Sequence, residues 1–332
     1  MMLATLQAAK QTVWSALMRL PGADPHSACH ELLAPDCAWH VGHPIELLSG
    51  PQAVAEGFFA PLAASFPDLE RRPDIFLGGH WDGRFDGGQG WWVSCSGHYL
   101  GTFSADWLGI PATGEPATLR FGEFYRVVDG RIAEARILLD IVDLARQAGR
   151  RILPASAGLE LCVPGPRLHD GLVLGACDPL AGEISLGVVE AMIGGLMRYD
   201  ARDLQSMGMR AHWREDMMWY GPGGIGTSRG IGGFERHHQA PFLHAFPDRK
   251  GGTHRARIAE AGFVASTGWP SVRATHRGDY LGVPASHRPI QMRVMDWWRC
   301  DGGLLAENWV LIDLPHLMLQ MGVDLMARLG QR

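Results

Sequence analysis

The chain contains the same sequence pattern twice, and this duplication limits the possible folds more than any other feature. Residues 60–68 (APLAASFPD) match residues 240–248 (APFLHAFPD) at an offset of 180. Further along, residues 106–113 (DWLGIPAT) match residues 279–286 (DYLGVPAS) at an offset of 173. Because the matches keep the same order, we infer a tandem duplication. The change of offset indicates about seven extra residues in the first copy, and they fit best in the Gly-rich stretch 82–90.

Each copy is expected to begin with helices and to end with strands. Helical periodicity covers residues 3–20 and 186–199, and a shorter helix follows near 51–66 and 231–246. Alternation of apolar and polar residues then predicts strands in both copies: 91–103, 119–127 and 132–140, and 272–280, 290–300 and 304–313. Helices followed by antiparallel strands predict an α+β unit.

The length of the chain and the connection between the copies predict two domains. At about 150 residues per domain, 332 residues correspond to about two domains. Residues 148–184 are rich in proline and glycine, which is typical of a linker. We therefore expect a first unit at 1–147, a linker at 148–184 and a second unit at 185–332.

Charge and cysteine usage exclude several classes of partner. The formal net charge of −5 argues against nucleic acid or an anionic membrane surface as the main partner. No apolar run approaches the ~18 residues of a membrane span, so we expect no membrane contact. The six cysteines lack metal-binding spacing and predict reduced thiols in the cytoplasm. We expect neither a metal nor an organic cofactor.

Three motifs follow one another in the C-terminal part of the second copy. They are THRGDYLGVPA at 275–285, DWWR at 296–299 and GGLLAENW at 302–309. The first copy has related strings, LGIPATG at 108–114 and EFYR at 123–126. Together they resemble the SnoaL-like polyketide cyclase family, with its His-x-Gly and Leu-Gly-x-Pro turn, its Asp-x-x-Arg strand and its turn into Glu-x-Trp. The resemblance covers both copies outside the linker.

This resemblance implies the fold shared by nuclear transport factor two and ketosteroid isomerase. We therefore expect two tandem cone-shaped α+β barrels, each with N-terminal helices packed on a curved antiparallel sheet. Barrels of this superfamily commonly pair through their sheets, which implies an internal pseudo-dimer and leaves a further homodimer open. The superfamily contains cyclases, isomerases, dehydratases, epoxide hydrolases and non-enzymes, so the fold alone does not define the activity.

Polar side chains on otherwise apolar strand faces are the candidate catalytic groups. Strand alternation places Asp296, His276 and Asn308 of the second unit on such faces. The first unit retains only Glu123 as a possible second site, because Ala135 stands at the position of Asn308. A carboxylate among apolar neighbours has a raised pKa and exchanges protons near neutral pH. Asp296 is the expected acid or base, with His276 as its partner and Asn308 as donor to an enolate oxygen.

The aromatic residues Trp219, Trp298 and Tyr280 are expected to form flat walls for a small hydrophobic or aromatic carbonyl ligand. The resemblance implies an enzyme that catalyses intramolecular aldol ring closure, or an isomerisation, without a cofactor. Two alternatives stay open: a small-molecule binding protein without turnover, and a cone-barrel dehydratase or epoxide hydrolase. Each polar residue also has a structural interpretation, as a buried group bonded to the backbone or to an arginine.

Other motifs are interpreted as structural. The Gly-rich segment 221–233 lacks the βαβ context and the lysine of a phosphate-binding loop. The pair Glu134 and Glu307 falls on a charged strand face, which favours a salt bridge or a contact between units. Packing or exposure explains three histidines better than metal binding, since the first unit has Phe58 and Ala64 at two of their positions: His237, His238 and His244.

Overall fold

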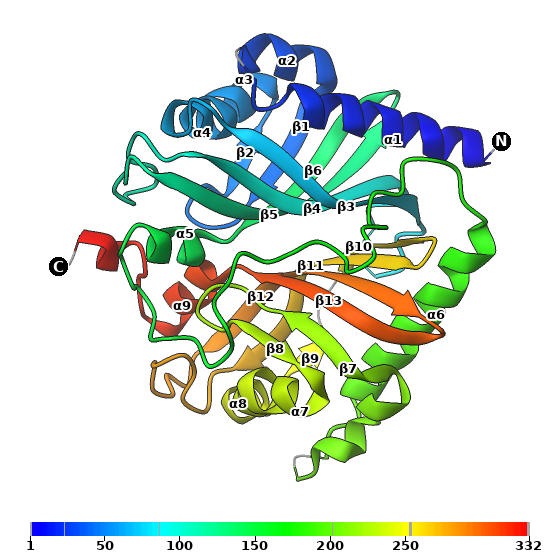
Figure 1. Cartoon of the computed structure of the whole chain (residues 1–332), viewed down its shortest axis with the longest axis vertical. Coiled ribbons are helices and arrows are strands. Elements are labelled where there is room, and N and C mark those ends of the chain that lie inside the picture. The colour runs from blue at the N-terminus through cyan, green and yellow to red at the C-terminus, as the bar shows by residue number, and fades with distance from the viewer. Residues whose placement is uncertain (1, 23, 86, 201, 252–253, 331–332) are drawn as a thin grey trace.

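The computed structural model describes residues 2–22, 24–85, 87–200, 202–251 and 254–330. Two curved sheets face each other at the centre of the molecule, and most helices lie on their outward sides (Figure 1). The first unit contains α1 (Met2–Arg19), α2 (Pro25–Leu32), β1 (Leu33–Val41), β2 (Leu47–Ser49), α3 (Pro51–Val54), the π-helical turn η1 (Ala55–Phe59), α4 (Ala60–Ser65), β3 (Glu70–Trp81), β4 (Gly90–Thr102), β5 (Pro116–Val128), β6 (Arg131–Leu139) and α5 (Ile141–Gln147).

The second unit repeats this order. It contains α6 (Pro179–Leu196), the 3-10 turns η2 (Leu204–Met207) and η3 (Met209–Ala211), β7 (Trp213–Tyr220), β8 (Thr227–Arg229), α7 (Gly230–Phe234), the π-helical turn η4 (Glu235–Gln239), α8 (Ala240–Ala245), β9 (Lys250–Gly251), β10 (His254–Glu260), β11 (Phe263–Thr275), β12 (Pro289–Asp301), β13 (Leu304–Ile312), α9 (Leu314–Met321) and the 3-10 turn η5 (Ala327–Gly330).

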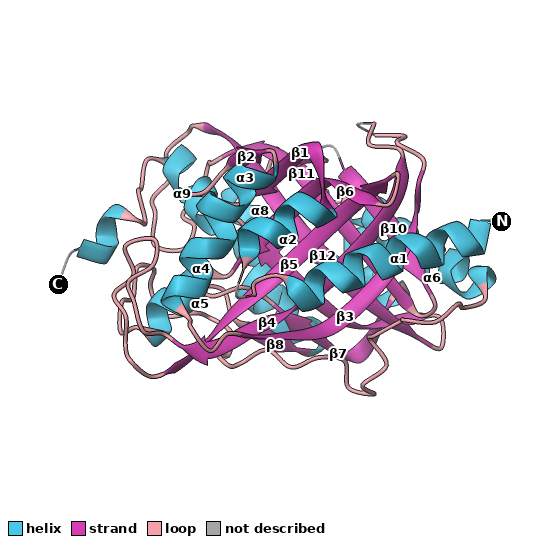
Figure 2. Cartoon of the chain, turned by 90° about the horizontal axis from the view of Figure 1, so that it is seen from above, coloured by secondary structure: helices cyan, strands magenta, loops and turns pink. Residues whose placement is uncertain are grey.

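Strand order is the same in the two sheets. The first runs β2-β1-β6-β5-β4-β3 and the second β8-β7-β13-β12-β11-β10, with β9 beside β11. The pairs β1–β6 and β7–β13 are parallel, and the other pairs are antiparallel. The predicted α+β class with two equivalent units is confirmed. Among the described strands neither sheet closes on itself. In the first unit, helices α1, α2, α3 and α4 lie across the face of the sheet that is seen from above (Figure 2).

Two predicted elements differ in extent from the structure. The helix predicted at 186–199 begins earlier, at Pro179, where Asp178 accepts a hydrogen bond from Leu180 N as its N-cap. The strand predicted at 272–280 ends at Thr275.

Among the described helices, α6 is long and apolar enough by composition to span a membrane, with a mean hydropathy of 1.3, so the expectation that no such run exists was wrong. In the structure α6 packs on β10 and β11.

The sheet faces that are turned away from the helices pack against each other. A second apolar core lies between them and includes these residues of both units: Trp92, Phe124, Trp297, Trp309 and Leu311. A Cβ at Gly122 would stand 2.3 Å from the ring of Trp297, so glycine is needed for this close approach. Trp297 Nε1 donates to Ser94 Oγ at 2.9 Å across the interface. The strand face that carries Arg120 is therefore buried between the units and not in water, and Arg120 is only 8% exposed.

Equivalent residues make equivalent contacts across this interface. Asp140 Oδ2 accepts a hydrogen bond from Gly223 N at 2.9 Å, and Asp313 Oδ2 accepts one from His43 N at 3.0 Å. Asp140 and Asp313 are counterparts in the repeat, as are His43 and Gly223. Such reciprocal contacts are the mark of an isologous interface. The Gly-rich segment after β7 therefore serves packing between the units.

Charged contacts link the units at the periphery of the interface. Glu134 on β6 pairs with Arg255 on β10 at 2.7 Å, as expected for a salt bridge between units. Lys10 on α1 pairs with Glu260 on β10 at 2.7 Å, and Glu190 on α6 pairs with Arg84 of the β3–β4 hairpin. Ion pairs thus hold the first unit to the second sheet and to α6, in addition to the apolar contacts.

Candidate active site

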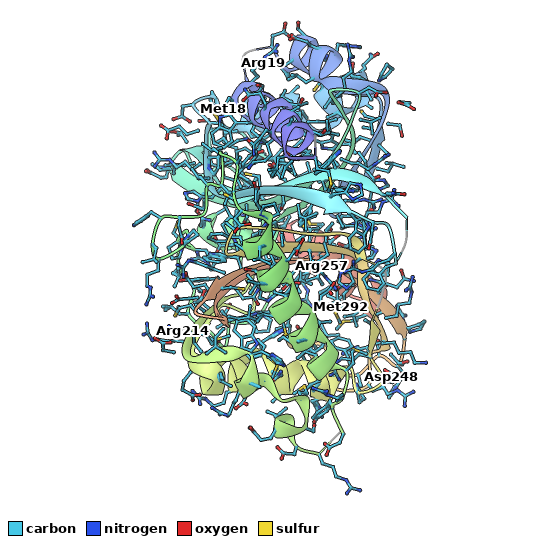
Figure 3. All side chains as sticks on the ribbon, turned by 90° about the vertical axis from the view of Figure 1, so that its right-hand side faces the viewer. Met18, Arg19, Arg214, Asp248, Arg257 and Met292 are labelled. Atoms are coloured by element: carbon cyan, nitrogen blue, oxygen red, sulfur yellow. The ribbon has the colours of Figure 1, made fainter. Side chains whose placement is uncertain are left out.

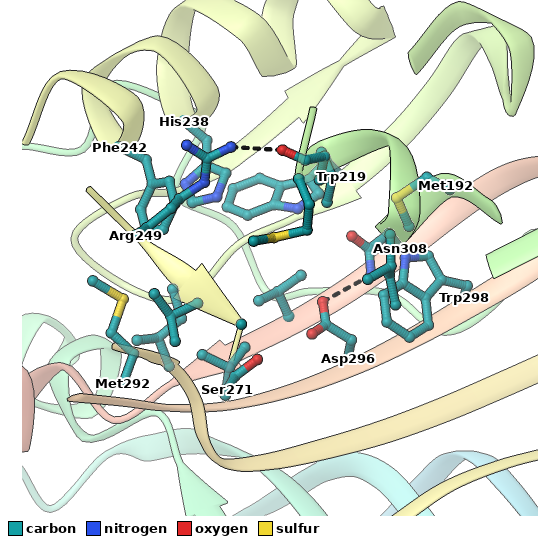
Figure 4. Close-up of a pocket in the computed structure, with 18 of the residues that line it drawn as sticks. Met192, Trp219, His238, Phe242, Arg249, Ser271, Met292, Asp296, Trp298 and Asn308 are labelled. Carbon is teal, nitrogen blue, oxygen red and sulfur yellow. Dashed lines mark hydrogen bonds between the residues drawn. The ribbon is translucent and has the colours of Figure 1, made fainter. Parts of the chain in front are cut away.

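A cavity of about 210 Å³ opens in the second unit, between the inner face of its sheet and the helices that cover it (Figure 4). Its polar groups include Asp296 and Asn308 on the sheet, His238 on η4 and Arg249 just before β9. An apolar cavity with a few convergent polar groups is typical of a small-molecule site. Most of the wall is apolar and includes Met192, Leu196, Trp213, Trp219, Phe234, Val272, Met292, Val294, Trp298, Val310 and Ile312.

Asp296 lies on β12 and faces the cavity together with Val294 and Trp298. Its side chain is half-buried, because it opens onto the cavity. Burial raises the pKa of the Asp296 carboxyl to about 7, although the hydrogen bond from Asn308 and the charge of Arg257 lower it. Arg257 lies beside α6 (Figure 3) and is 3.5 Å from Glu190. Asp296 is therefore able to take up and release a proton near neutral pH.

Asn308 stands beside Asp296 on the neighbouring strand β13. Its Nδ2 donates to the backbone carbonyls of Trp297 at 3.0 Å and Trp309 at 3.4 Å. The same nitrogen reaches Asp296 Oδ1 at 3.5 Å (Figure 4). Because the backbone carbonyls already engage the amide N–H groups, this geometry suits a residue that orients Asp296 better than a donor to a substrate oxygen.

Of the six residues that we expected at the site of the second unit, four line the cavity and two do not. Trp219 and Trp298 lie in the cavity wall. His276 lies outside the cavity, fully buried, and its Nδ1 accepts a hydrogen bond from Ser286 N at 3.1 Å. Tyr280 also lies outside, edge-on to Phe246 at 5.0 Å. Strand alternation failed for both residues because β11 ends at Thr275 and the chain then turns.

The equivalent place in the first unit is filled by side chains. Glu123 Oε2 accepts a hydrogen bond from Arg71 Nη1 at 2.6 Å, and Tyr99 OH donates to Glu123 Oε1 at 3.2 Å. The guanidinium of Arg71 also lies over the rings of Tyr99 and Phe121. Glu123 is fully buried and paired within the protein, so the expectation of a second site at this residue is not supported by the geometry.

Smaller residues in the second unit open the cavity at the same positions. Val294 on β12 stands at the position of Phe121 on β5, at the repeat offset of 173. Val272 corresponds to Tyr99, because the two pair with equivalent residues of β12 and β5. The position of Arg71, opposite Tyr99, corresponds to Gly251, opposite Val272. The second unit thus lacks the cation and the two rings that cover the carboxylate in the first unit.

His238 is a cavity residue that the sequence interpretation set aside. Its ring stacks on Trp219 at 4.3 Å between centroids, and its Nδ1 has no partner in the described part of the chain. Burial lowers the pKa of His238 to about 4, so the imidazole is neutral at pH 7. The sequence contained a signal for this residue, because the first unit has the apolar Phe58 at the equivalent position. We interpreted that difference only as an argument against a metal site.

Within the described ranges, no group of three His, Cys, Asp or Glu side chains converges in a geometry that suits a metal ion. His237 instead contacts Ser228 Oγ through its Nδ1 at 3.1 Å. The six cysteines are free thiols, and Cys162 is the exposed one. The polar side chains of the cavity include Asp296, Asn308, His238 and Arg249.

Comparison with known proteins defines the family. The sequence profile of the SnoaL-like polyketide cyclase family matches residues 22–148 and 198–321, which is more than half of the chain and includes both units. The chain therefore belongs to the SnoaL-like polyketide cyclase family, as a tandem duplication. No curated protein matches the chain.

Several solved structures are similar to parts of the chain. AclR from Streptomyces galilaeus has 23% sequence identity and a TM-score of 0.34, covering 42% of this chain and 80% of that protein. IdmH from Streptomyces antibioticus has 23% identity and a TM-score of 0.34, covering 41% of this chain and 99% of that protein. TsrD from Streptomyces laurentii has 20% identity and a TM-score of 0.35, covering 44% and 98%.

Proposed function

We propose that the second unit is a cofactor-free enzyme of the cyclase or isomerase type that moves protons on a small hydrophobic carbonyl compound. One observation supports this most strongly. Asp296 opens onto an apolar cavity with a pKa of about 7, whereas its counterpart Glu123 is covered by Arg71. An uncovered carboxylate of this kind is a group poised for acid–base catalysis.

In the proposed reaction, ionised Asp296 removes a proton from a carbon next to the substrate carbonyl. The electron pair of the broken C–H bond forms an enolate, which attacks a second carbonyl of the same molecule and closes a C–C bond. Protonated Asp296 then returns its proton to the new alkoxide, so that substrate and product are isomers. Asn308 orients the carboxyl, and Trp219 and Trp298 hold the flat part of the substrate.

The first unit serves as the structural partner in this proposal. Units 1–147 and 185–332, joined by the linker 148–184, act as an internal pseudo-dimer, with the first turn of α6 lying in the last residues of that linker. Their interface buries the sheet faces that are turned away from the helices. These faces are the surfaces with which a unit could pair with a second copy. We therefore expect the mass of one chain in solution by light scattering, and a stable mass of two chains would show a further homodimer. The free thiols fit the cytoplasm as the site of action.

The experiment that tests the function follows proton exchange on a probe ketone. Exchange of the acidic CH₂ protons of 2-tetralone in D₂O is measured by NMR with the wild type and with Asp296→Asn. We expect the variant to lose about 100-fold or more of the catalysed rate. Asp216→Asn is the matched control, since this exposed aspartate pairs with Arg214 outside the cavity.

Equal exchange rates for wild type and Asp296→Asn would overturn the catalytic assignment. Binding of 2-tetralone without any catalysed exchange by the wild type would favour a binding protein that has no turnover. Both results are read from the same samples, because binding shifts the probe resonances independently of isotope exchange.

A further inference from the structure

Arg249 places a cation on the cavity wall, and the described ranges contain no acidic partner for it. Its guanidinium Nη2 donates to the carbonyl of Leu196 at 2.7 Å, and its Cζ lies 5.5 Å from the centre of the Tyr199 ring. In the described part of the chain, no carboxylate pairs with this side chain. Other half-buried arginines of the second unit do have such partners, as Arg293 has in Asp313. A half-buried guanidinium left in this state is poised to accept an anion.

The charges around the cavity favour an anionic ligand. Arg249 and the exposed Lys250 lie next to each other at its rim, and Asp296 is the acidic residue of its lining. Figure 4 shows Arg249 beside His238 and Phe242, across the cavity from Asp296. The net charge of −5 repels anions from the molecule as a whole. A local cationic rim is therefore what would attract an anionic ligand to this cavity.

We propose that Arg249 binds the carboxylate of the substrate, and that the cavity takes a hydrophobic keto acid whose acidic carbon lies against Asp296. This proposal rests on the proposed function for the role of Asp296, whereas the role of Arg249 concerns binding alone. The planar guanidinium matches the two oxygens of a carboxylate, and Leu196 O holds it in place. Held in this way, the ligand has one defined direction in the cavity.

The cavity volume limits the size of this keto acid. Sites for drug-sized ligands usually measure about 300–1,000 Å³, whereas this cavity measures about 210 Å³. It therefore encloses a compound of one or two rings, and further rings of a larger polyketide would project through the mouth. Trp219 and Trp298 offer flat surfaces to such rings.

Calorimetric titration with two probes of equal shape tests the proposal. 2-Naphthoate carries the carboxylate, and 2-naphthamide is its neutral counterpart. We expect the wild type to bind naphthoate at least about tenfold more tightly than naphthamide. Arg249→Gln should lose this preference, with unchanged affinity for naphthamide, and Arg249→Lys should keep part of it. Arg273→Gln is the matched control, because Arg273 is exposed and outside the cavity lining.

Equal affinity of the wild type for the two probes would overturn the proposal, and so would a naphthoate affinity that Arg249→Gln leaves unchanged. An equal loss in Arg249→Gln and Arg273→Gln would also overturn it, since net charge and not a local site would then explain binding. These results do not depend on turnover. If Arg249 selects naphthoate while 2-tetralone exchange is absent, the proposed reaction fails and the anion site stands.

Discussion

At the residue scale, Asp296 and Glu123 are counterparts whose surroundings give them different chemistry. Glu123 is neutralised by Arg71 and bonded to Tyr99, so its charge is satisfied inside the protein. Asp296 has a weak contact with Asn308 and the more distant charge of Arg257, so burial dominates and raises its pKa. The same backbone position thus supports a structural ion pair in one unit and a proton-exchanging group in the other.

The raised pKa of Asp296 predicts a pH-dependent effect of Asp296→Asn on stability. The pKa is about 7 in the folded state against 3.8 for an unperturbed aspartate, so ionisation destabilises the folded wild type as pH rises from about 4 through 7. The variant should therefore be more stable than the wild type at pH 8, by at most about 4 kcal/mol, and equal to it near pH 4. Thermal unfolding at both pH values measures this. A difference in Tm that does not change with pH would contradict it.

At the element scale, the strands β11 and β12 build a cavity where β4 and β5 build a packed core. Val272 and Val294 take the places of Tyr99 and Phe121, which removes two aromatic rings from one side of the cone. The pairing of β11 with β12 also shifts between Gly268 and Val272, and this irregularity separates the two strand halves. The helices of the two units differ less, since both contain a π-helical turn at the same point.

Refilling the cavity should abolish binding while the fold is kept. Val294→Phe restores the side chain of the first unit and places a ring where the ligand would lie, so we expect at least a tenfold loss of 2-naphthoate affinity. Far-UV circular dichroism and calorimetry check fold and binding in one preparation. The matched control is Phe121→Val, which should lower stability through a new cavity, by about 2–4 kcal/mol, without changing affinity. Unchanged affinity in Val294→Phe would place the ligand elsewhere.

At the scale of the whole molecule, reversed charges at equivalent contacts specify which units pair. Lys10 of α1 meets an acid of the second unit, Glu260, whereas Glu190, its counterpart on α6, meets a base of the first unit, Arg84. If two first units paired in the same way, Lys10 would face Arg84, and two second units would bring Glu190 to Glu260. Like charges would oppose both arrangements, so the interface favours pairing of unlike units.

The two ion pairs should differ in strength because they differ in burial. Lys10 and Glu260 are 2% and 6% exposed, whereas Arg84 and Glu190 are 38% and 39% exposed. Double-mutant cycles with Lys10→Met and Glu260→Gln should give a coupling free energy of about 1–3 kcal/mol. The cycle with Arg84→Met and Glu190→Gln should give less than about 1 kcal/mol. Chemical denaturation measures both coupling free energies. Equal values would show that burial does not decide how much an ion pair contributes to stability.

The sequence by itself determined the duplication, the α+β class and the strand faces on which Asp296 and Asn308 lie. It did so because repeats and two-residue alternation are local properties of a chain. The same reasoning failed for His276, where the strand ends one residue too early for alternation to apply. It also misjudged His238, because helix position alone does not show what a side chain stacks on.

Only the tertiary structure decided what each face meets. Alternation separates the two sides of a strand, but it does not distinguish water from a second sheet. The family resemblance implied pairing through the sheets, but only the structure placed Trp297 and Arg120 in that interface. Alternation also does not show that Gly251 and Val272 leave Asp296 uncovered, because these two residues lie on other strands, β9 and β11. The cavity, and Arg249 with no carboxylate partner among the described residues, arise from contacts between residues distant in sequence. Packing in three dimensions alone brings these residues together.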